Sequence, residues 1–438
     1  MSIDLKYGVP TVALHTQMFH RVTQSVVRMA GAPRMRQVYL PHPIMGKTEA
    51  EIRAFIWGNN PVTGKPVMRE VVEGLTQPLG ADDKSGLTFE RSTPRLCDAA
   101  GEEDLHRLFL ENHWTDQLPI VLPTEERVAA MLKGTSRKPE EVVGHLAPTH
   151  FREEWEFTVE KVAVNAVMAG ARPEYFPVIL AMAASGTSAR GSSTSSMATM
   201  SVVNGPIRHE LNMNAGIGAL SPYNHANATI GRAFGLLSQN LQGGSVPGDT
   251  YMGSTGNPIA YASPTVAENE ERSPWEPLHV QHGFKPGQSV VTVFSAMRSG
   301  AFTLGLRHKH WKTHVRNMLI GMDPNDGPTF VLDPIVARLF MDIGGLKTKQ
   351  ALIDWVHENG TMKAGEYWDY QLIQNYRYPR ATFGEEPFAS NLKAKDDEQI
   401  RLWSKDEINV VVVGGETNGY WRIFGARRGK SVCIDDWR

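Results

Sequence analysis

Carboxamide side chains and glycines crowd the stretch between residues 202 and 249. Asparagine is a neutral donor and acceptor, suited to orienting a carboxylate, carbonyl or amide, and glycine lets a backbone approach a ligand closely. One asparagine alone is more often a cap or a turn residue, but the cluster favours a site. The sequence predicts substrate contacts at Asn204, Asn212, Asn214, Asn227 and Arg232.

A helix is predicted inside this stretch, over ATIGRAFGLLSQNL, with Asn227 as its N-cap. The N-terminus of a helix presents free amides and positive potential to an anion. Arg232, in the second turn, would add positive charge. We therefore expect a small, polar, anionic substrate.

Three clustered carboxylates follow in AENEE, residues 267–271, at positions 268, 270 and 271. If this segment is extended, Glu268 and Glu270 share a face. Neighbouring carboxylates raise one pKa, which makes a general acid at neutral pH. Both are candidate proton-transfer groups, and Asn269 and Trp275 are candidate substrate contacts; the alternative is a solvated acidic turn.

A further candidate base lies on the helix predicted within TVEKVAVNAVMAG, residues 158–170. Lys161 and Asn165 are four residues apart and share one stripe of an otherwise apolar helix. A buried lysine is readily tuned for acid–base work, whereas a lysine at the surface edge only rests its stem on apolar atoms. The sequence leaves both open for Lys161, and Asn165 is a candidate substrate contact.

Metal, cofactor and dithiol signals are weak. The histidines of HVQH (279–282) and HKHWKTH (308–314) have no acidic partner pattern, so no metal site is predicted. There is neither a Walker A sequence nor a strand-linked GxGxxG, and the cofactor stays unknown. Cys97 and Cys433 are far apart, which excludes a CxxC motif, a cysteine-based zinc site and a disulfide framework within this chain.

The elements that would position these groups have an α/β pattern. Strands are predicted at 9–16 and 36–44. Three helices are predicted: one over 18–31, one that begins at the capping box of Thr48 and Glu51, and one that begins at Pro66. This order predicts a parallel sheet with right-handed crossovers. His42, between two prolines after the second strand, is a candidate residue at the border of the site. Residues 408–415, INVVVVGG, read as a buried strand.

We predict three parts: an incomplete α/β module over 1–80, a polar linker over 81–95, and a larger α/β or α+β catalytic domain over 96–438. The net charge of −2 gives no general attraction to nucleic acid or anionic membrane. No run of 18 apolar residues and no leader pattern is present, so a cytoplasmic protein is expected.

The motifs TVEKVAVNAVMAG, VNGPIRHEL, HANATIGRAF and VAENEERSPWEPLHV together resemble the large proteins linked to the UGSC-type selenoprotein and thiol family. The segment GVPTVALHTQMF…YLPHPIMGKTEAEIRA resembles the second half of the small UGSC domain itself. The resemblance implies a Rossmann-like N-terminal module and redox or thiol-dependent small-molecule chemistry. The family's selenocysteine-or-cysteine, glycine, serine, cysteine motif is missing from this chain.

Three functions follow from these observations. In the first, the chain is a thiol-linked oxidoreductase in an oligomer, and a small CGSC-containing subunit supplies the missing motif. Alternatively, it is a non-redox lyase, hydratase or hydrolase that uses its lysine and glutamate groups. A third reading is a non-catalytic subunit that completes a partner's active site.

Overall fold

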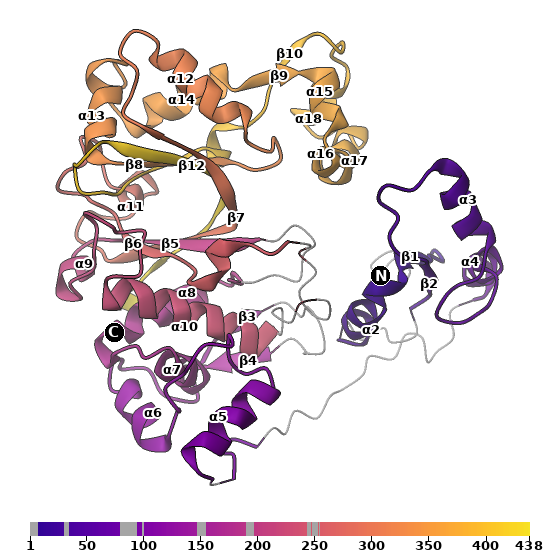
Figure 1. The fold of residues 1–438 in the computed structure, drawn as a ribbon, viewed down its shortest axis with the longest axis horizontal. Coiled ribbons are helices and arrows are strands. Elements are labelled where there is room, and N and C mark those ends of the chain that lie inside the picture. Colours follow the sequence, from indigo (N-terminus) through magenta and orange to yellow (C-terminus); the bar gives the residue numbers. More distant parts are fainter. Residues whose placement is uncertain are drawn as a thin grey trace.

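The fold is described from a computed structural model that covers residues 8–29, 35–78, 94–98, 100–146, 155–189, 197–242, 247, 253 and 255–438. Helices and a mixed sheet make up the structure, which confirms the predicted α/β class (Figure 1). The predicted linker, 81–95, falls mainly outside the described residues, and the domain boundaries stay predictions. No described helix has both the length and the apolar character needed to cross a membrane.

The N-terminal module contains β1 (Ala13–Thr16), α2 (His20–Met29) and β2 (Gln37–Leu40), and β1 pairs with β2 in parallel. The helix α3 (Glu49–Trp57) begins at the predicted capping box of Thr48 and Glu51, and α4 (Val67–Thr76) follows Pro66. The predicted order of strands and helices and the parallel pairing are confirmed. The Rossmann-like character of this module stays a prediction.

A six-stranded sheet organises the remaining residues, in the order β11-β8-β12-β7-β5-β6. The strands β5 and β6 are parallel, as are β8 and β11, and the other neighbours are antiparallel. The predicted buried strand at 408–415 is confirmed as β11, which is buried along its whole length. The strands are β5 (Ala198–Asn204), β6 (Thr265–Ala267), β7 (Val290–Leu304), β8 (Pro328–Leu332), β11 (Asn409–Val412) and β12 (Tyr420–Cys433).

The sheet consists of two halves with the same topology. One half contains β5, β6 and β7, and the other contains β8, β11 and β12. In each half the first strand, β5 or β8, lies between the other two. The second strand, β6 or β11, pairs with it in parallel at the edge of the sheet, and the long third strand, β7 or β12, pairs with it antiparallel toward the middle of the sheet. The sequences after β5 and β8 are PIRHELNMNAG (206–216) and PIVARLFMDIG (334–344), which share Pro, Ile, Leu, Met and Gly at the same spacing. We infer an internal repeat with an approximate two-fold axis between β7 and β12.

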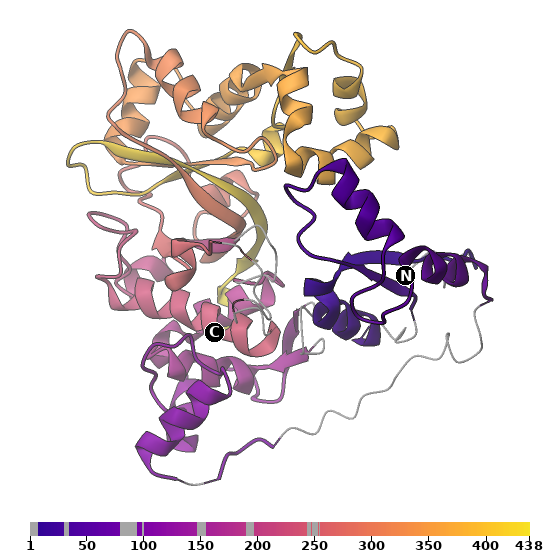
Figure 2. The ribbon, with the colours of Figure 1, turned by 45° about the vertical axis from the view of Figure 1, so that its right-hand side comes forward.

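Helices cover the outer face of each half, and apolar side chains from both halves fill the space between the inner faces. Figure 1 shows α7, α8 and α10 on the side of β5 and β6, and α12, α13 and α14 on the side of β8. Figure 2 shows β12 as a long curved strand, and it pairs with both β7 and β8. The helices of the first half include α5 (Glu102–Glu111), α6 (Glu125–Leu132), α7 (Val159–Met168), α8 (Phe176–Ala184), α9 (Ile207–Glu210), α10 (His225–Gln242) and α11 (Leu278–Gln281).

The second half carries α12 (Trp311–Ile320), α13 (Pro334–Asp342) and α14 (Lys349–Asn359). Between α14 and β11 it also holds a small insertion: β9 (Thr361–Lys363), α15 (Ala364–Asp369), α16 (Gln371–Tyr376), α17 (Tyr378–Thr382), α18 (Phe388–Leu392) and β10 (Gln399–Arg401). The two outer strands of the sheet meet at their tips, because Asn269 N donates to Val412 O at 2.8 Å. The ends of β5, β6 and β11 therefore come together where the two halves join.

Candidate functional site

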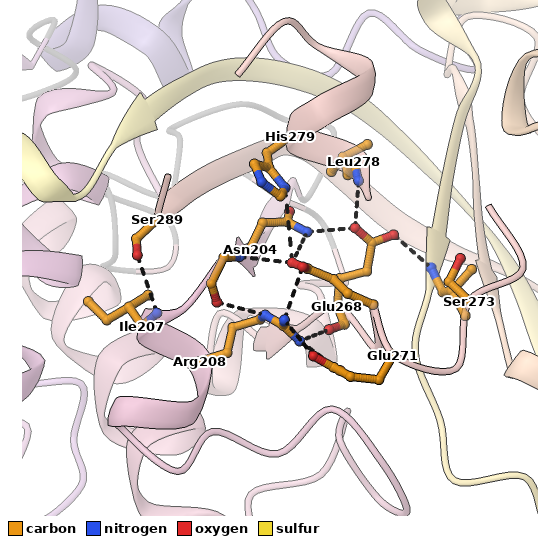
Figure 3. Close-up of polar contacts among 12 residues, drawn as sticks. Asn204, Ile207, Arg208, Glu268, Glu271, Ser273, Leu278, His279 and Ser289 are labelled. Carbon is orange, nitrogen blue, oxygen red and sulfur yellow. Dashed lines mark hydrogen bonds and ion pairs between the residues drawn. The ribbon is translucent and has the colours of Figure 1, made fainter. Parts of the chain in front are cut away.

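Asn204 ends β5, and Glu268 directly follows β6, its parallel neighbour. The side-chain amide of Asn204 donates to Glu268 Oε2 at 2.6 Å and to Glu270 Oε1 at 2.9 Å. Figure 3 shows the side chains of Asn204 and Glu268 pointing toward one another. Of the two alternatives for this segment, the structure has a turn, since β6 ends at Ala267 and Glu270 N donates back to Glu268 O. A turn, and not strand alternation, brings the two carboxylates to the same amide.

Glu268 is fully buried and forms an ion pair with Lys349, whose side chain is also fully buried, at 2.6 Å. The carboxylate also accepts from Leu278 N at 2.6 Å and from Val412 N at 3.3 Å. Burial by itself raises the pKa of Glu268, but the Lys349 ammonium and these hydrogen bonds hold it below its ordinary value. The sequence argument expects one carboxylate of the pair to have a raised pKa, and Glu268 is not that carboxylate. An ionised and fully hydrogen-bonded Glu268 positions its neighbours.

Arg208 is a buried cation beside the other two carboxylates. Its guanidinium lies 3.0 Å from Glu270 and 3.0 Å from Glu271, and it donates to Glu268 O at 2.7 Å. Burial raises the pKa of Glu271, yet the hydrogen bonds from Arg208 and His209 lower it to about 2. Arg208 thus keeps this acidic turn folded against α9.

His279, in the first turn of α11, has no exposed surface, and neither ring nitrogen has a hydrogen-bond partner among the described residues. Its Nδ1 lies 4.0 Å from Glu270 Oε1. The buried Oδ1 of Asn204 also has no partner there. Unpaired buried polar groups cost about 1–3 kcal/mol each, so two of them beside one carboxylate suggest a functional reason.

Sequence reasoning missed His279, Arg208 and Lys349 as members of this cluster. The HVQH pattern bears only on a metal site, and in the described residues no group of three or more His, Cys, Asp or Glu side chains could hold a metal ion. The sequence signal that was present is the run GPIR after Asn204, because a strand that ends at glycine and proline delivers its next side chains to the sheet edge. Lys349 follows the helix-capping Thr348 and resembles an ordinary surface lysine.

Two predicted substrate contacts join the halves of the sheet. Asn269 Nδ2 donates to Gly414 O at 2.8 Å, next to the hydrogen bond between Asn269 N and Val412 O. Trp275 is buried, and its indole nitrogen donates to Leu346 O at 3.0 Å. These contacts give both residues a structural task beside Glu268.

The asparagines between 212 and 227 form hydrogen bonds mainly with one another, each between the side chain of one and the backbone of another. Asn214 N donates to Asn227 Oδ1 at 3.1 Å, and Asn227 Nδ2 donates to Asn214 O at 2.9 Å. Helix α10 begins at His225, and Asn224 Oδ1 accepts from Asn227 N at 3.0 Å. The prediction that Asn227 caps this helix is wrong: Asn224 is the cap, and Asn227 in the first turn ties down the preceding loop. Asn212 O accepts from Asn224 Nδ2 at 2.8 Å in the same loop.

The other predicted residues contact partners outside the Glu268 cluster. Arg232 makes two hydrogen bonds of 3.0 Å to Asp116, which neutralises its charge. Asn165 on α7 accepts from Asn240 on α10 at 2.7 Å, and Lys161 lies one turn before it. In the N-terminal module, His42 Nδ1 lies 3.0 Å from Thr16 Oγ1. The lysine that reaches Glu268 is Lys349, not Lys161.

The N-terminal module, with its parallel β1 and β2 followed by α3, carries the likeness to known proteins. Residues 3–60 match the UGSC family. The predicted resemblance is thus confirmed for this part, a UGSC-like segment within a larger protein. The UGSC match ends before α4 and does not extend to the Glu268 cluster. No curated protein matches the chain, and no solved structure does.

Proposed function

We propose that this chain is a cytoplasmic enzyme that transfers protons on a small polar metabolite, with His279 as the acid–base group. The observation that carries the proposal is the fully buried His279, whose two ring nitrogens have no hydrogen-bond partner in the part of the chain that the structure describes and whose Nδ1 lies 4.0 Å from Glu270. Histidine changes charge near neutral pH. A carboxylate beside an imidazole orients the ring and selects its tautomer.

The cluster assigns a role to each neighbour of His279. Glu270 orients the imidazole, while Glu268 and Lys349 form the rigid support beneath it. The buried Oδ1 of Asn204, which has no partner among the described residues, would accept a hydrogen bond from a substrate hydroxyl or amide. Arg208 stabilises the turn that holds Glu270. This chemistry is that of a lyase, hydratase or hydrolase without a redox step.

The anionic character expected of the substrate finds little support in this cluster. Arg232 is paired with Asp116, and the N-terminus of α10 is capped by Asn224. Arg208 is already engaged by carboxylates. A polar and uncharged reacting group fits the cluster better.

A second candidate, thiol-linked oxidoreduction, is favoured by the position of Cys433. Val290 of β7 pairs with Asn204 on one side and with Cys433 on the other, so this thiol lies at the same end of the sheet. The Cys433 thiolate would attack the disulfide of an oxidised CGSC-containing partner subunit, which forms a mixed disulfide and releases the partner's other cysteine as a thiolate. Partner binding is supported by the apolar side chains that the UGSC-like segment exposes, among them Leu14 on β1 and Trp57 on α3.

A substrate screen tests the first candidate. The purified chain is incubated in D2O, without thiols and under anaerobic conditions, with a panel of hydroxy acids, amides and polyols, and exchange or turnover is followed by NMR. We expect His279→Asn and Glu270→Gln to abolish the activity. His282→Asn is the matched control. Burial, Arg428 and Lys349 lower the pKa of His282 to about 4, so this histidine is neutral near pH 7 and its replacement should leave the activity unchanged.

The outcomes separate the candidates. Turnover that persists in His279→Asn contradicts the assignment of His279. Turnover that requires a thiol and disappears in Cys433→Ser supports the second candidate. The chain is a non-catalytic subunit if it is inactive alone but restores activity to a co-purified CGSC protein, and if the His279→Asn variant restores that activity as well.

A further inference from the structure

A cavity of about 990 Å³ lies in the second half of the chain, between α14, the insertion β9–β10 and β12. Its walls include His357, Arg377, Arg401, Trp403 and Arg428. The volume is at the upper end of the range typical of small-molecule sites, roughly 300–1,000 Å³. Its lining residues are different from those of the Glu268 cluster.

Two residues that line this cavity each carry a hydrogen-bond donor that has no partner among the described residues. The indole Nε1 of Trp403 and the Nε of Arg428 are buried and have no partner among the described residues, and Trp403 is only 2% exposed. Both groups can donate but cannot accept. A molecule that satisfies them must present acceptor atoms.

The arginines of the wall divide into two kinds. Arg377 and Arg380 are paired with Glu407 and Glu385, and both stack on the ring of Phe388, at 4.8 Å and 4.5 Å. They form a rigid, neutralised part of the wall.

Arg401, Arg427 and Arg428 differ, because none of them forms an ion pair with a described residue. Burial lowers the pKa of Arg428, and Asp406 acts in the opposite direction. The carboxylates of Glu358, Glu386 and Asp406 also line the cavity. The ligand's anionic group therefore belongs at the Arg428 and Trp403 wall.

The segment that carries Trp403 is held in place by contacts with His357 and Gly360. His357 Nδ1 lies 2.7 Å from Trp403 O, and since a carbonyl oxygen only accepts, Nδ1 carries the proton. The ring of Trp403 also contacts Gly360 so closely that a Cβ there would lie 2.8 Å from it. The indole N–H is thus fixed before any ligand enters, which lowers the entropic cost of binding.

We propose that this cavity binds an organic anion whose phosphate or carboxylate oxygens accept hydrogen bonds from Trp403 Nε1 and Arg428 Nε. A guanidinium binds either group in a bidentate manner. The remaining volume accommodates a ligand of metabolite size. The inference does not depend on the proton-transfer function proposed for His279.

Calorimetric titration of the full chain with inorganic phosphate and with citrate, at constant ionic strength, tests the proposal. We expect at least one of the two anions to bind in the millimolar range or tighter, and the anion that binds identifies the group recognised. Arg428→Gln and Trp403→Phe each remove one donor and should weaken binding by about tenfold or more. Arg422→Gln is the matched control, because Arg422 is on the same strand but stacks on Phe302, outside the cavity.

Three results would overturn the proposal: neither anion binds, binding is unchanged in Arg428→Gln, or Arg422→Gln weakens it equally. Thermal unfolding of each variant without ligand shows whether it is folded. Should Trp403→Phe fail to fold, Arg428→Gln alone decides, since Arg428 is partly exposed at the end of a strand-paired segment.

Discussion

Lys349, the first residue of α14, forms a fully buried ion pair of 2.6 Å with Glu268, which follows β6. The pair connects the two halves of the internal repeat. The hydrogen bond between Asn269 and Val412 and that between Trp275 and Leu346 join the same two halves. Position and rigidity of the candidate site therefore depend on a contact between the halves.

Removing one partner of this pair should strongly destabilise the fold. Lys349→Met leaves Glu268 charged and buried, and Glu268→Gln leaves the ammonium without its carboxylate. Each should lower the free energy of unfolding by about 3–5 kcal/mol, measured by urea denaturation. The control is Glu271→Gln, because the side chain of Glu271 is 52% exposed and should contribute about 1 kcal/mol or less. Equal losses of unfolding free energy in Glu268→Gln and Glu271→Gln would show that the buried ion pair contributes no more to stability than the exposed carboxylate does.

The same pair predicts a pH dependence. The pKa of Glu268 is held below its ordinary value of 4.5, so the unfolded state binds a proton more readily than the folded state. Its contribution to stability is complete above the unfolded pKa and is lost as the pH falls through the folded pKa. Urea titrations across this acidic range should show that the stability gap between wild type and Glu268→Gln narrows. A gap that widens on acidification would contradict the direction of the shift.

The buried imidazole of His279 should lower the free energy of unfolding of the wild-type protein. Because both ring nitrogens are buried and have no hydrogen-bond partner among the residues that the structure describes, His279→Leu removes unsatisfied polar atoms at similar volume. The free energy of unfolding should stay constant or rise by about 1 kcal/mol, while any proton-transfer activity is lost. Asn204→Leu is the contrasting variant, since its amide donates to two carboxylates and its loss should destabilise the protein. A large destabilisation by His279→Leu would show that the imidazole is held by contacts in the native state.

Local signals predicted much of the secondary structure, whereas the site required tertiary information. The capping box at Thr48 and the strand of INVVVVGG depend on neighbours in sequence, and both occur as expected. Asn204, Glu268 and Glu270 were placed in one site, and they do lie together. Lys349 was missed because its partner is a strand tip in the other half of the repeat.

Arg232 marks the limit of reasoning from charge and helix position. Its side chain pairs with Asp116, which is 3% exposed, so we expect a structural role. Arg232→Ala should lower the free energy of unfolding by about 1.5–3 kcal/mol without changing kcat/KM. Arg53→Ala is the control: its pair with Glu49 is solvent-exposed and should contribute within about 0.5 kcal/mol. A changed KM at unchanged stability would return Arg232 to the substrate site.

Gly205 is the residue where a single methyl group should disturb the site most directly. Its φ is +85°, and an added Cβ would lie 2.1 Å from the carbonyl oxygen of Gln288. Left-handed backbone costs roughly 1–2 kcal/mol for a side chain, and overpacking adds about 1–3 kcal/mol. Gly205→Ala should therefore destabilise the protein by about 2–5 kcal/mol, measured by urea denaturation.

Gly283→Ala separates the two costs, because Gly283 has a φ of +89° but nothing within 4 Å of its added Cβ. It should lose only the backbone contribution, about 1–2 kcal/mol. Gly205→Ala has a second expected effect: Gly205 N donates to Glu270 Oε1 at 2.8 Å, so a displaced backbone loosens the carboxylate that faces His279. Equal stability losses in the two variants would mean that the strand end moves freely, and the contact with Gln288 would then have no part in positioning Glu270.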